Sequence, residues 1–157
     1  MNLRIGYGED AHALAGGRPL VIGSVTIPDS PLGTVAHSDG DVLLHALSDA
    51  LLSTFALGDI GHYFPPSDER YKNMDRVKIL EHVLLELRKH SNNIQIQNLA
   101  AVITLDKPKL GKHREVIQNK VAELLGLEPH NVGITFKTSE GMATGHVQAR
   151  VTVLLTA

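Results

Sequence analysis

Stretches with the periodicity of strands alternate along this chain with stretches that have the periodicity of helices, and no linker separates them. Strand patterns cover residues 3–8, 20–27, 95–105, 132–138 and 148–155. Helix patterns cover about 39–57, 75–90 and 112–125, where apolar residues recur at helical spacing. In 157 residues this order predicts a single α/β domain over 1–157, with a sheet covered by helices on one face. The other face then needs a partner, so we expect a homo-oligomer.

The composition excludes several classes of protein. The chain has no cysteine, so any zinc must be held by histidine and carboxylate side chains. A formal net charge of -2 without a basic run speaks against a nucleic-acid partner. No apolar stretch has the length of a membrane span or the pattern of a signal peptide. We therefore expect a cytoplasmic protein with neither a nucleic-acid nor a membrane partner.

The strongest chemical signal is the pair Asp10 and His12, followed by His45 on the first predicted helix. Residues i and i+2 of an extended segment share a face, so the first two side chains can point to one place. With His45 they would form a three-ligand zinc site with an open fourth position, as in catalytic zinc centres. Two interpretations stay open. His45 could instead be a surface residue in charge pairs with Asp41 and Asp49, or the carboxylate at i+4 could orient a metal-bound imidazole.

Two further polar segments follow predicted strands. The segment 106–109 has, on composition alone, the pattern of a charged turn. The segment 137–141 places an ammonium, two hydroxyls and a carboxylate close together. It is either a polar turn or a site for phosphate and a divalent cation.

These stretches together carry a resemblance to a known family. Over essentially its whole length, the chain resembles the 2-C-methyl-D-erythritol 2,4-cyclodiphosphate synthases. The most specific stretches are AHSDGDVLLHALSDALL at 36–52 and LGDIGHYFP at 57–65. IGYGEDAH at 5–12, DKPKLGKH at 106–113 and KTSEG at 137–141 support it.

The resemblance implies a fold and a reaction. The expected fold is a small α/β (α+β) subunit with a four-stranded mixed sheet covered by helices on one face. Three subunits would form a homotrimer with an active site at each interface. The expected enzyme is a phosphorus–oxygen lyase of the non-mevalonate isoprenoid pathway. It converts 4-diphosphocytidyl-2-C-methyl-D-erythritol 2-phosphate to the 2,4-cyclodiphosphate and releases CMP, with metal ions assisting attack of the 2-phosphate on the β-phosphorus.

The resemblance also implies roles for single residues. Asp10, His12 and His45 match zinc ligands, and Glu140 matches a ligand of a second divalent cation, Mg²⁺ or Mn²⁺. The two positions that match catalytic groups, which stabilise the transition state by hydrogen bonding, are His37 and Thr138. The methylerythritol phosphate part would meet Asp10, His12, His37, Ser38, Asp59, Gly61, Phe64, Ser67 and Asp68. The cytidine diphosphate part would meet Leu105, Asp106, Lys107, Pro108, Lys109, Leu110, Gly111, Lys137, Thr138, Ser139 and Glu140.

The chain departs from the common family pattern at three places. The 64–68 loop has lost one carboxylate, and His146 stands where a phosphate-binding arginine is usual. Lys137 stands where threonine is commoner. We expect the Lys137 ammonium to restore positive charge near the diphosphate, as a point charge without the bidentate geometry of arginine. The alternative is that strand alternation turns Lys137 away from Thr138 and into solvent.

Two other functions stay open alongside the cyclising lyase. One is a zinc phosphohydrolase that attacks a nucleotide diphosphate with metal-activated water. The other is a non-catalytic trimer that binds isoprenoid or cytidine ligands.

Overall fold

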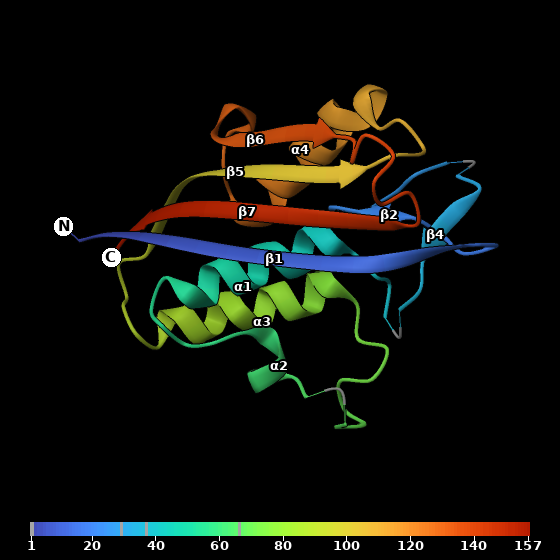
Figure 1. Cartoon of the computed structure of the whole chain (residues 1–157). Coiled ribbons are helices and arrows are strands. Elements are labelled where there is room, and N and C mark those ends of the chain that lie inside the picture. The colour runs from blue at the N-terminus through green and yellow to red at the C-terminus, as the bar shows by residue number, and fades with distance from the viewer. Residues whose placement is uncertain (1, 29, 37, 66) are drawn as a thin grey trace.

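The structure, a computed structural model, describes residues 2–28, 30–36, 38–65 and 67–157. The main sheet contains β1 (Leu3–Gly16), β4 (Leu32–Thr34), β5 (Gln95–Leu105), β6 (Val132–Lys137) and β7 (His146–Thr156), in the order β4-β1-β7-β5-β6. Strands β5 and β6 are parallel, and every other neighbouring pair is antiparallel. The predicted mixed sheet is therefore confirmed (Figure 1).

The expected number of four strands is wrong, because the sheet has five. Strand β1 continues eight residues past its predicted end and offers a free edge, on which β4 pairs with Leu14–Gly16. Such a short, glycine-containing segment has too little alternation to be recognised as a strand. The strand expected over 20–27 is instead a hairpin of β2 (Val21–Ile22) and β3 (Val25–Thr26). Its turn residues, Gly23 and Ser24, both have left-handed backbone angles.

The three long helices lie where the apolar spacing predicts them. They are α1 (Val42–Ser53), α3 (Arg76–Arg88) and α4 (Arg114–Leu125), with short 3₁₀ turns at η1 (Gly111–His113) and η2 (Pro129–Asn131). Helix α4 ends at Gly126, whose left-handed conformation suits a residue without a Cβ atom. The sequence did not predict α2 (Ile60–Tyr63), a single turn capped by the Asp59 carboxylate.

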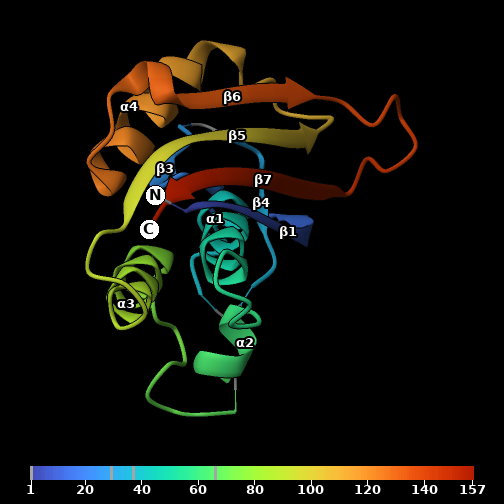
Figure 2. The same cartoon turned by 90° about the vertical axis from the view of Figure 1, so that its left-hand side faces the viewer.

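Helices α1, α3 and α4 cover one face of the sheet, as predicted (Figure 2). Alternate residues of the two central strands point into this covered side and are buried: Leu99, Ala101, Ile103, Leu105, Val147, Ala149, Val151, Val153 and Leu155. On β1, the residues of the opposite face leave large apolar side chains exposed, with Leu3 at 67%, Ile5 at 71% and Tyr7 at 51%. One face of the sheet thus belongs to the core and the other presents an uncovered apolar stripe.

The packing of α1 on β1 positions the site. Gly6 and Gly8 of β1 face the helix, and a Cβ atom on either would overlap a carbonyl oxygen, of Ala50 and Ala46 respectively. Asp10 and His12 follow on the same face of the strand. The strand register places His12 opposite Val147, and Val147 opposite Leu105. The predicted metal ligands and the predicted cytidine segment therefore lie at the same end of the sheet.

In the part of the chain that the structure describes, no helix combines the length and the apolar character that crossing a bilayer requires. The cytoplasmic location stays a prediction.

Replacing Gly8 by alanine tests the packing of α1 on β1. The new Cβ would overlap the backbone oxygen of Ala46, which can move only if α1 shifts. We expect the free energy of unfolding to fall by an amount near the upper end of the ~1–3 kcal/mol that overpacking costs, as measured by urea denaturation. Gly145→Ala is the matched control, because its new Cβ has no neighbour within 4 Å. Equal denaturation midpoints for the two variants would contradict the tight contact.

Candidate active site

Asp10, His12 and His45 converge at the junction of β1 and α1. The Asp10 Oδ2 atom lies 3.1 Å from Nε2 of His12 and 3.2 Å from Nδ1 of His45. One ligand atom from each residue can be chosen so that all lie within 4.8 Å of one another. The predicted convergence of these side chains is therefore confirmed, and the group can hold a metal ion.

The donor set fits a tetrahedral ion. Oδ2 of Asp10, Nε2 of His12 and Nδ1 of His45 are shielded from solvent, yet none has a hydrogen-bond partner among the described residues. Buried polar atoms without partners are rare and need an explanation. Ligands about 2.0–2.1 Å from a tetrahedral ion lie roughly 3.3 Å apart, close to the two short separations found here.

Two aspartates flank His45 in the sequence, Asp49 within α1 and Asp41 just before it, and their side chains bind different partners. Asp49, one turn later, places Oδ2 3.3 Å from Nε2 of His45. Its other oxygen accepts a hydrogen bond from the Ile60 amide, at 2.8 Å. Asp41 forms no charge pair with His45 but caps α1, accepting from the Leu44 amide at 3.1 Å.

Asp41 also ties the β2–β3 turn to the start of α1. Its carboxylate accepts hydrogen bonds from the Gly23 and Ser24 amides, at 3.0 and 2.6 Å. Burial raises the pKa of Asp41 to about 6, because desolvation outweighs the three backbone hydrogen bonds that favour the ionised form.

A cavity of about 680 Å³ opens beside the three converging side chains. Its wall includes His12 and His45, together with four residues predicted to contact the methylerythritol phosphate: Ser38, Asp59, Gly61 and Phe64. The sequence analysis missed two cations that line the same cavity, Lys72 and Arg76. The sequence feature that could have indicated them is a pair of basic residues next to the predicted start of α3. The Nε atom of Arg76 is buried and has no hydrogen-bond partner in the described part of the chain.

A second cavity, of about 300 Å³, contains most of the predicted cytidine segment. It is lined by Leu105, Pro108, Lys109, Leu110 and Gly111, and by Lys137 and Thr138 at the end of β6. Lys137 therefore lies beside the same cavity as Thr138, although its side chain is exposed.

The Asp106 carboxylate joins this segment to the 138–141 turn. It accepts hydrogen bonds from the amide and the hydroxyl of Ser139, the latter at 2.9 Å, and from the Gly141 amide at 3.2 Å. The hydrogen bonds from Ser139 hold the pKa of Asp106 below its usual value. Glu140, between these donors, is exposed and has a left-handed backbone conformation.

The comparisons with known proteins agree with this geometry. The model of the YgbB family matches residues 3–156. The chain belongs to the YgbB family.

Two relatives carry the same name. The 2-C-methyl-D-erythritol 2,4-cyclodiphosphate synthase of Deinococcus radiodurans is 59% identical over 97% of this chain and 93% of that protein. An enzyme of the same name from Thermus thermophilus is 50% identical over 98% of this chain and 99% of that protein.

Solved structures agree with the relatives. One, of a 2C-methyl-D-erythritol-2,4-cyclodiphosphate synthase, matches with a TM-score of 0.91 at 48% identity and covers 98% of this chain and 100% of that one. Another, named as the CDP-bound form, matches with the same TM-score and coverage at 46% identity.

The remaining predicted residues of this YgbB-family chain lie in several places. Ser67 is exposed, and the Asp68 carboxylate binds Arg70, whose hydrogen bonds hold the pKa of Asp68 below its usual value. Lys107 is exposed and lines neither cavity. His37 lies outside the described residues.

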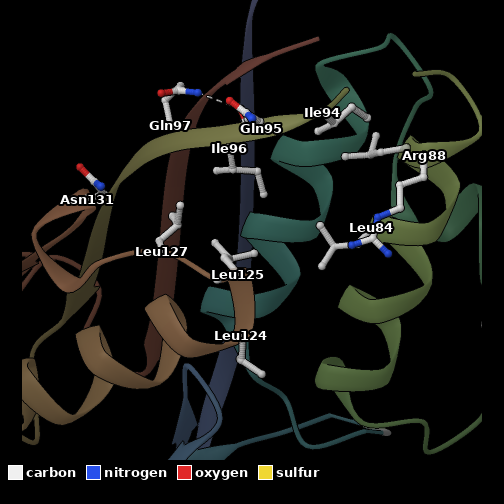
Figure 3. A pocket seen from close by; sticks show the side chains of 12 residues that line it. Leu84, Arg88, Ile94, Gln95, Ile96, Gln97, Leu124, Leu125, Leu127 and Asn131 are labelled. Carbon is white, nitrogen blue, oxygen red and sulfur yellow. Dashed lines mark hydrogen bonds between the residues drawn. The ribbon is translucent and has the colours of Figure 1, made fainter. Parts of the chain in front are cut away.

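A third cavity, of about 610 Å³, lies between α3, α4 and the start of β5 (Figure 3). Leucine and isoleucine side chains line most of it, and its polar groups are a guanidinium and amides. It contains no histidine or carboxylate, so it offers neither metal ligands nor acid–base groups. Histidine, carboxylate, hydroxyl and lysine side chains line the two cavities described above.

Replacing Asp106 by alanine should loosen the 138–141 turn. The Ser139 and Gly141 amides would lose the acceptor that holds them, so we expect their hydrogen exchange to become at least severalfold faster. Lys107→Ala, at the neighbouring exposed position, is the control and should leave both exchange rates unchanged. Unchanged exchange in Asp106→Ala would mean that the turn holds its shape without this carboxylate.

Proposed function

We propose that the chain is the catalytic domain, over 1–157, of a cyclodiphosphate synthase. It would convert 4-diphosphocytidyl-2-C-methyl-D-erythritol 2-phosphate to 2-C-methyl-D-erythritol 2,4-cyclodiphosphate and release CMP, as a phosphorus–oxygen lyase of the non-mevalonate pathway. The observation that carries the proposal is the convergence of three unpartnered ligand atoms, of Asp10, His12 and His45, beside a cavity. The name of a relative that is 59% identical supports the same reaction.

The metals follow from the donor sets. Asp10, His12 and His45 would hold Zn²⁺, because two imidazoles and a carboxylate suit that ion and leave one position open. Glu140 would ligate a second ion, Mg²⁺ or Mn²⁺, for which an exposed carboxylate is the appropriate ligand. When bound, the ions supply Lewis-acid stabilisation of charge on the phosphate oxygens.

The side chains of the larger cavity would position the attacking 2-phosphate. Lys72 and Arg76 offer positive charge to a phosphate there, and Ser38 offers a hydroxyl. The turn that starts at Asp59 would hold the methylerythritol carbons, with Phe64 as the apolar wall. Holding two anionic groups in line replaces the need for a protein nucleophile, since phosphoryl transfer depends mainly on positioning and electrostatics.

The smaller cavity would bind the cytidine diphosphate part. Backbone groups of 105–111 would recognise the base, and Thr138 would donate a hydrogen bond to the transition state, together with His37. The shared cavity of Lys137 and Thr138 supports a role for the Lys137 ammonium beside the diphosphate. Asp106 would act indirectly, by holding Glu140 in its turn.

The assembly would be a homotrimer with active sites at the subunit interfaces. The uncovered sheet face exposes Leu3, Ile5 and Tyr7 in one stripe, as expected of a surface that another subunit covers. The two cavities share no lining residue, which leaves each subunit free to contribute one half of a shared site.

Turnover in oxygen-18 water tests the reaction. Intramolecular cyclisation takes the attacking oxygen from the 2-phosphate, so we expect CMP and an unlabelled cyclic diphosphate by phosphorus NMR and mass spectrometry. A phosphohydrolase would put the label into its product. A non-catalytic binding protein would release no CMP. Either of these results would contradict the proposed function.

Replacing His45 by alanine tests the metal centre. Only two protein ligands would remain, so bound zinc should fall sharply. CMP release should fall by more than the ~10–100-fold that loss of an outer-sphere partner of a metal ligand costs. His130→Ala, which removes an exposed imidazole from η2, is the matched control. Circular dichroism checks that the fold survives. Full zinc content and normal CMP release in His45→Ala would refute the assignment.

Mixed trimers test where the active sites lie. His45→Ala chains would be defective in one half-site, and chains carrying both Pro108→Gly and Lys109→Ala would be defective in the other. If neighbouring subunits share each site, every mixed trimer contains one intact site, and an equal random mixture should recover about a quarter of the wild-type activity. Mass spectrometry verifies the subunit exchange. No recovery after verified exchange would place each site within one chain.

A further inference from the structure

The Asp49 carboxylate lies between the metal-ligand cluster and α2. Its Oδ2 atom faces Nε2 of His45 at 3.3 Å, and its Oδ1 atom accepts the Ile60 amide hydrogen at 2.8 Å. Its side chain is only 15% exposed. The Asp49 Cβ atom also packs against Gly8, where an added Cβ would approach it to 3.0 Å. The Asp49 side chain thus lies against β1, with His45 near one carboxylate oxygen and the Ile60 amide bound to the other.

We propose that Asp49 is a positioning residue that fixes the tautomer of His45 and couples the metal centre to the placement of α2. The proposal rests on the metal site of the proposed function, and it adds a link from that site to the wall that would hold the substrate.

The first part of the link concerns the proton on His45. A carboxylate can only accept, so a hydrogen bond between Asp49 and His45 requires a hydrogen on Nε2, which lies 3.3 Å from Oδ2. The lone pair of the neutral ring then lies on Nδ1, which is the nitrogen that points at Asp10. The carboxylate therefore selects the tautomer that can bind a metal, as outer-sphere partners of metal-bound histidines do.

The second part concerns α2. Ile60 is the first residue of α2, and its amide is one of the donors that a helix start leaves without an internal acceptor. Asp59, Ile60 and Gly61 all line the larger cavity. By binding this amide, Asp49 sets where the start of α2 stands relative to His45. One side chain thereby joins a metal ligand to the substrate-facing wall.

Asp49→Asn separates the two contacts, because an amide can accept through only one of its two terminal atoms. With its oxygen toward Ile60, the asparagine presents an NH₂ donor to His45 and favours the tautomer with hydrogen on Nδ1. With its oxygen toward His45, it presents a donor to the Ile60 amide, and that hydrogen bond is lost. In this variant, zinc binding and the bond to α2 exclude each other, whereas the wild-type carboxylate supports both.

The experiment titrates metal-free chains with zinc against a competing chelator and follows the Ile60 amide by hydrogen exchange. We expect Asp49→Asn to bind zinc about 10–100-fold more weakly than wild type. Loading the variant with zinc should accelerate exchange at Ile60, and loading the wild type should not. Asp75→Asn is the matched control: it makes the same change in charge, and among the described residues the Asp75 carboxylate accepts from a single amide, that of Lys78 at the start of α3.

A second measurement uses the wild-type chain, so it does not depend on a variant folding correctly. In the zinc-loaded protein, proton–nitrogen correlation spectra of the histidine rings should show hydrogen on Nε2 of His45 and metal on Nδ1. Ligation through Nε2 would overturn the proposal. It would also be overturned if Asp49→Asn weakened zinc binding by less than tenfold, or if loading the variant with zinc left the hydrogen-exchange rate of the Ile60 amide unchanged. A wild-type chain that binds no zinc would instead disprove the metal site itself, and with it the inference. Absence of CMP release from a zinc-binding wild type would contradict only the proposed reaction.

Discussion

The close contact between α1 and β1 is the constraint on which the site depends. Two glycines, Gly6 and Gly8, let the helix backbone approach the strand to a distance that no Cβ atom would allow. Asp10 and His12 continue that face of the strand, and His45 lies near the start of the helix. Because a sheet and a helix are both rigid, their contact fixes three ligand atoms without help from loops. The two glycines are therefore a precondition for the convergence of Asp10, His12 and His45.

Three carboxylates, of which Asp41 is buried, complete this arrangement by binding backbone donors from other segments of the chain. Asp41 holds the β2–β3 turn against the start of α1, and the cost of burying its charge is visible in a pKa raised to about 6. Asp49 binds α2, and Asp106 binds the 138–141 turn. A carboxylate offers acceptors on two oxygens, so each of these residues can hold two groups at once. An amide of the same shape accepts through only one of its two terminal atoms.

Periodicity predicted the long elements of the fold, in which many residues repeat the same apolar spacing. The alternation over 95–105 predicted β5 with its observed bounds, and the helical spacing over 112–125 predicted α4 with its observed end. The hairpin at 20–27 was missed, because the left-handed Gly23 and Ser24 interrupt a run that otherwise reads as one strand. Three-residue β4 and four-residue α2 are too short to carry a period.

The same distinction holds for the site. The i, i+2 spacing of Asp10 and His12 indicated that both side chains lie on one face of a strand. Their convergence with His45 was predicted because His45 lies on the first helix. The link from Asp49 to Ile60 spans 11 residues, and that from Asp106 to Ser139 spans 33. In each link the two partners lie on different elements or loops, so no helix or strand period relates them, and such contacts exist only once the chain has folded.

The positive charge at the proposed phosphate site also comes from residues that only folding brings together. His146 stands where the resemblance leads us to expect an arginine, but its Nδ1 atom binds the Ala143 carbonyl at 2.8 Å. A carbonyl only accepts, so Nδ1 carries a hydrogen committed to this local contact. The permanent cations at the two cavities are supplied elsewhere, by Lys72 and Arg76 in one and by Lys109, Arg114 and Lys137 in the other. A polyanionic substrate can thus be neutralised from both ends without the missing arginine, provided that the two cavities meet across a subunit interface.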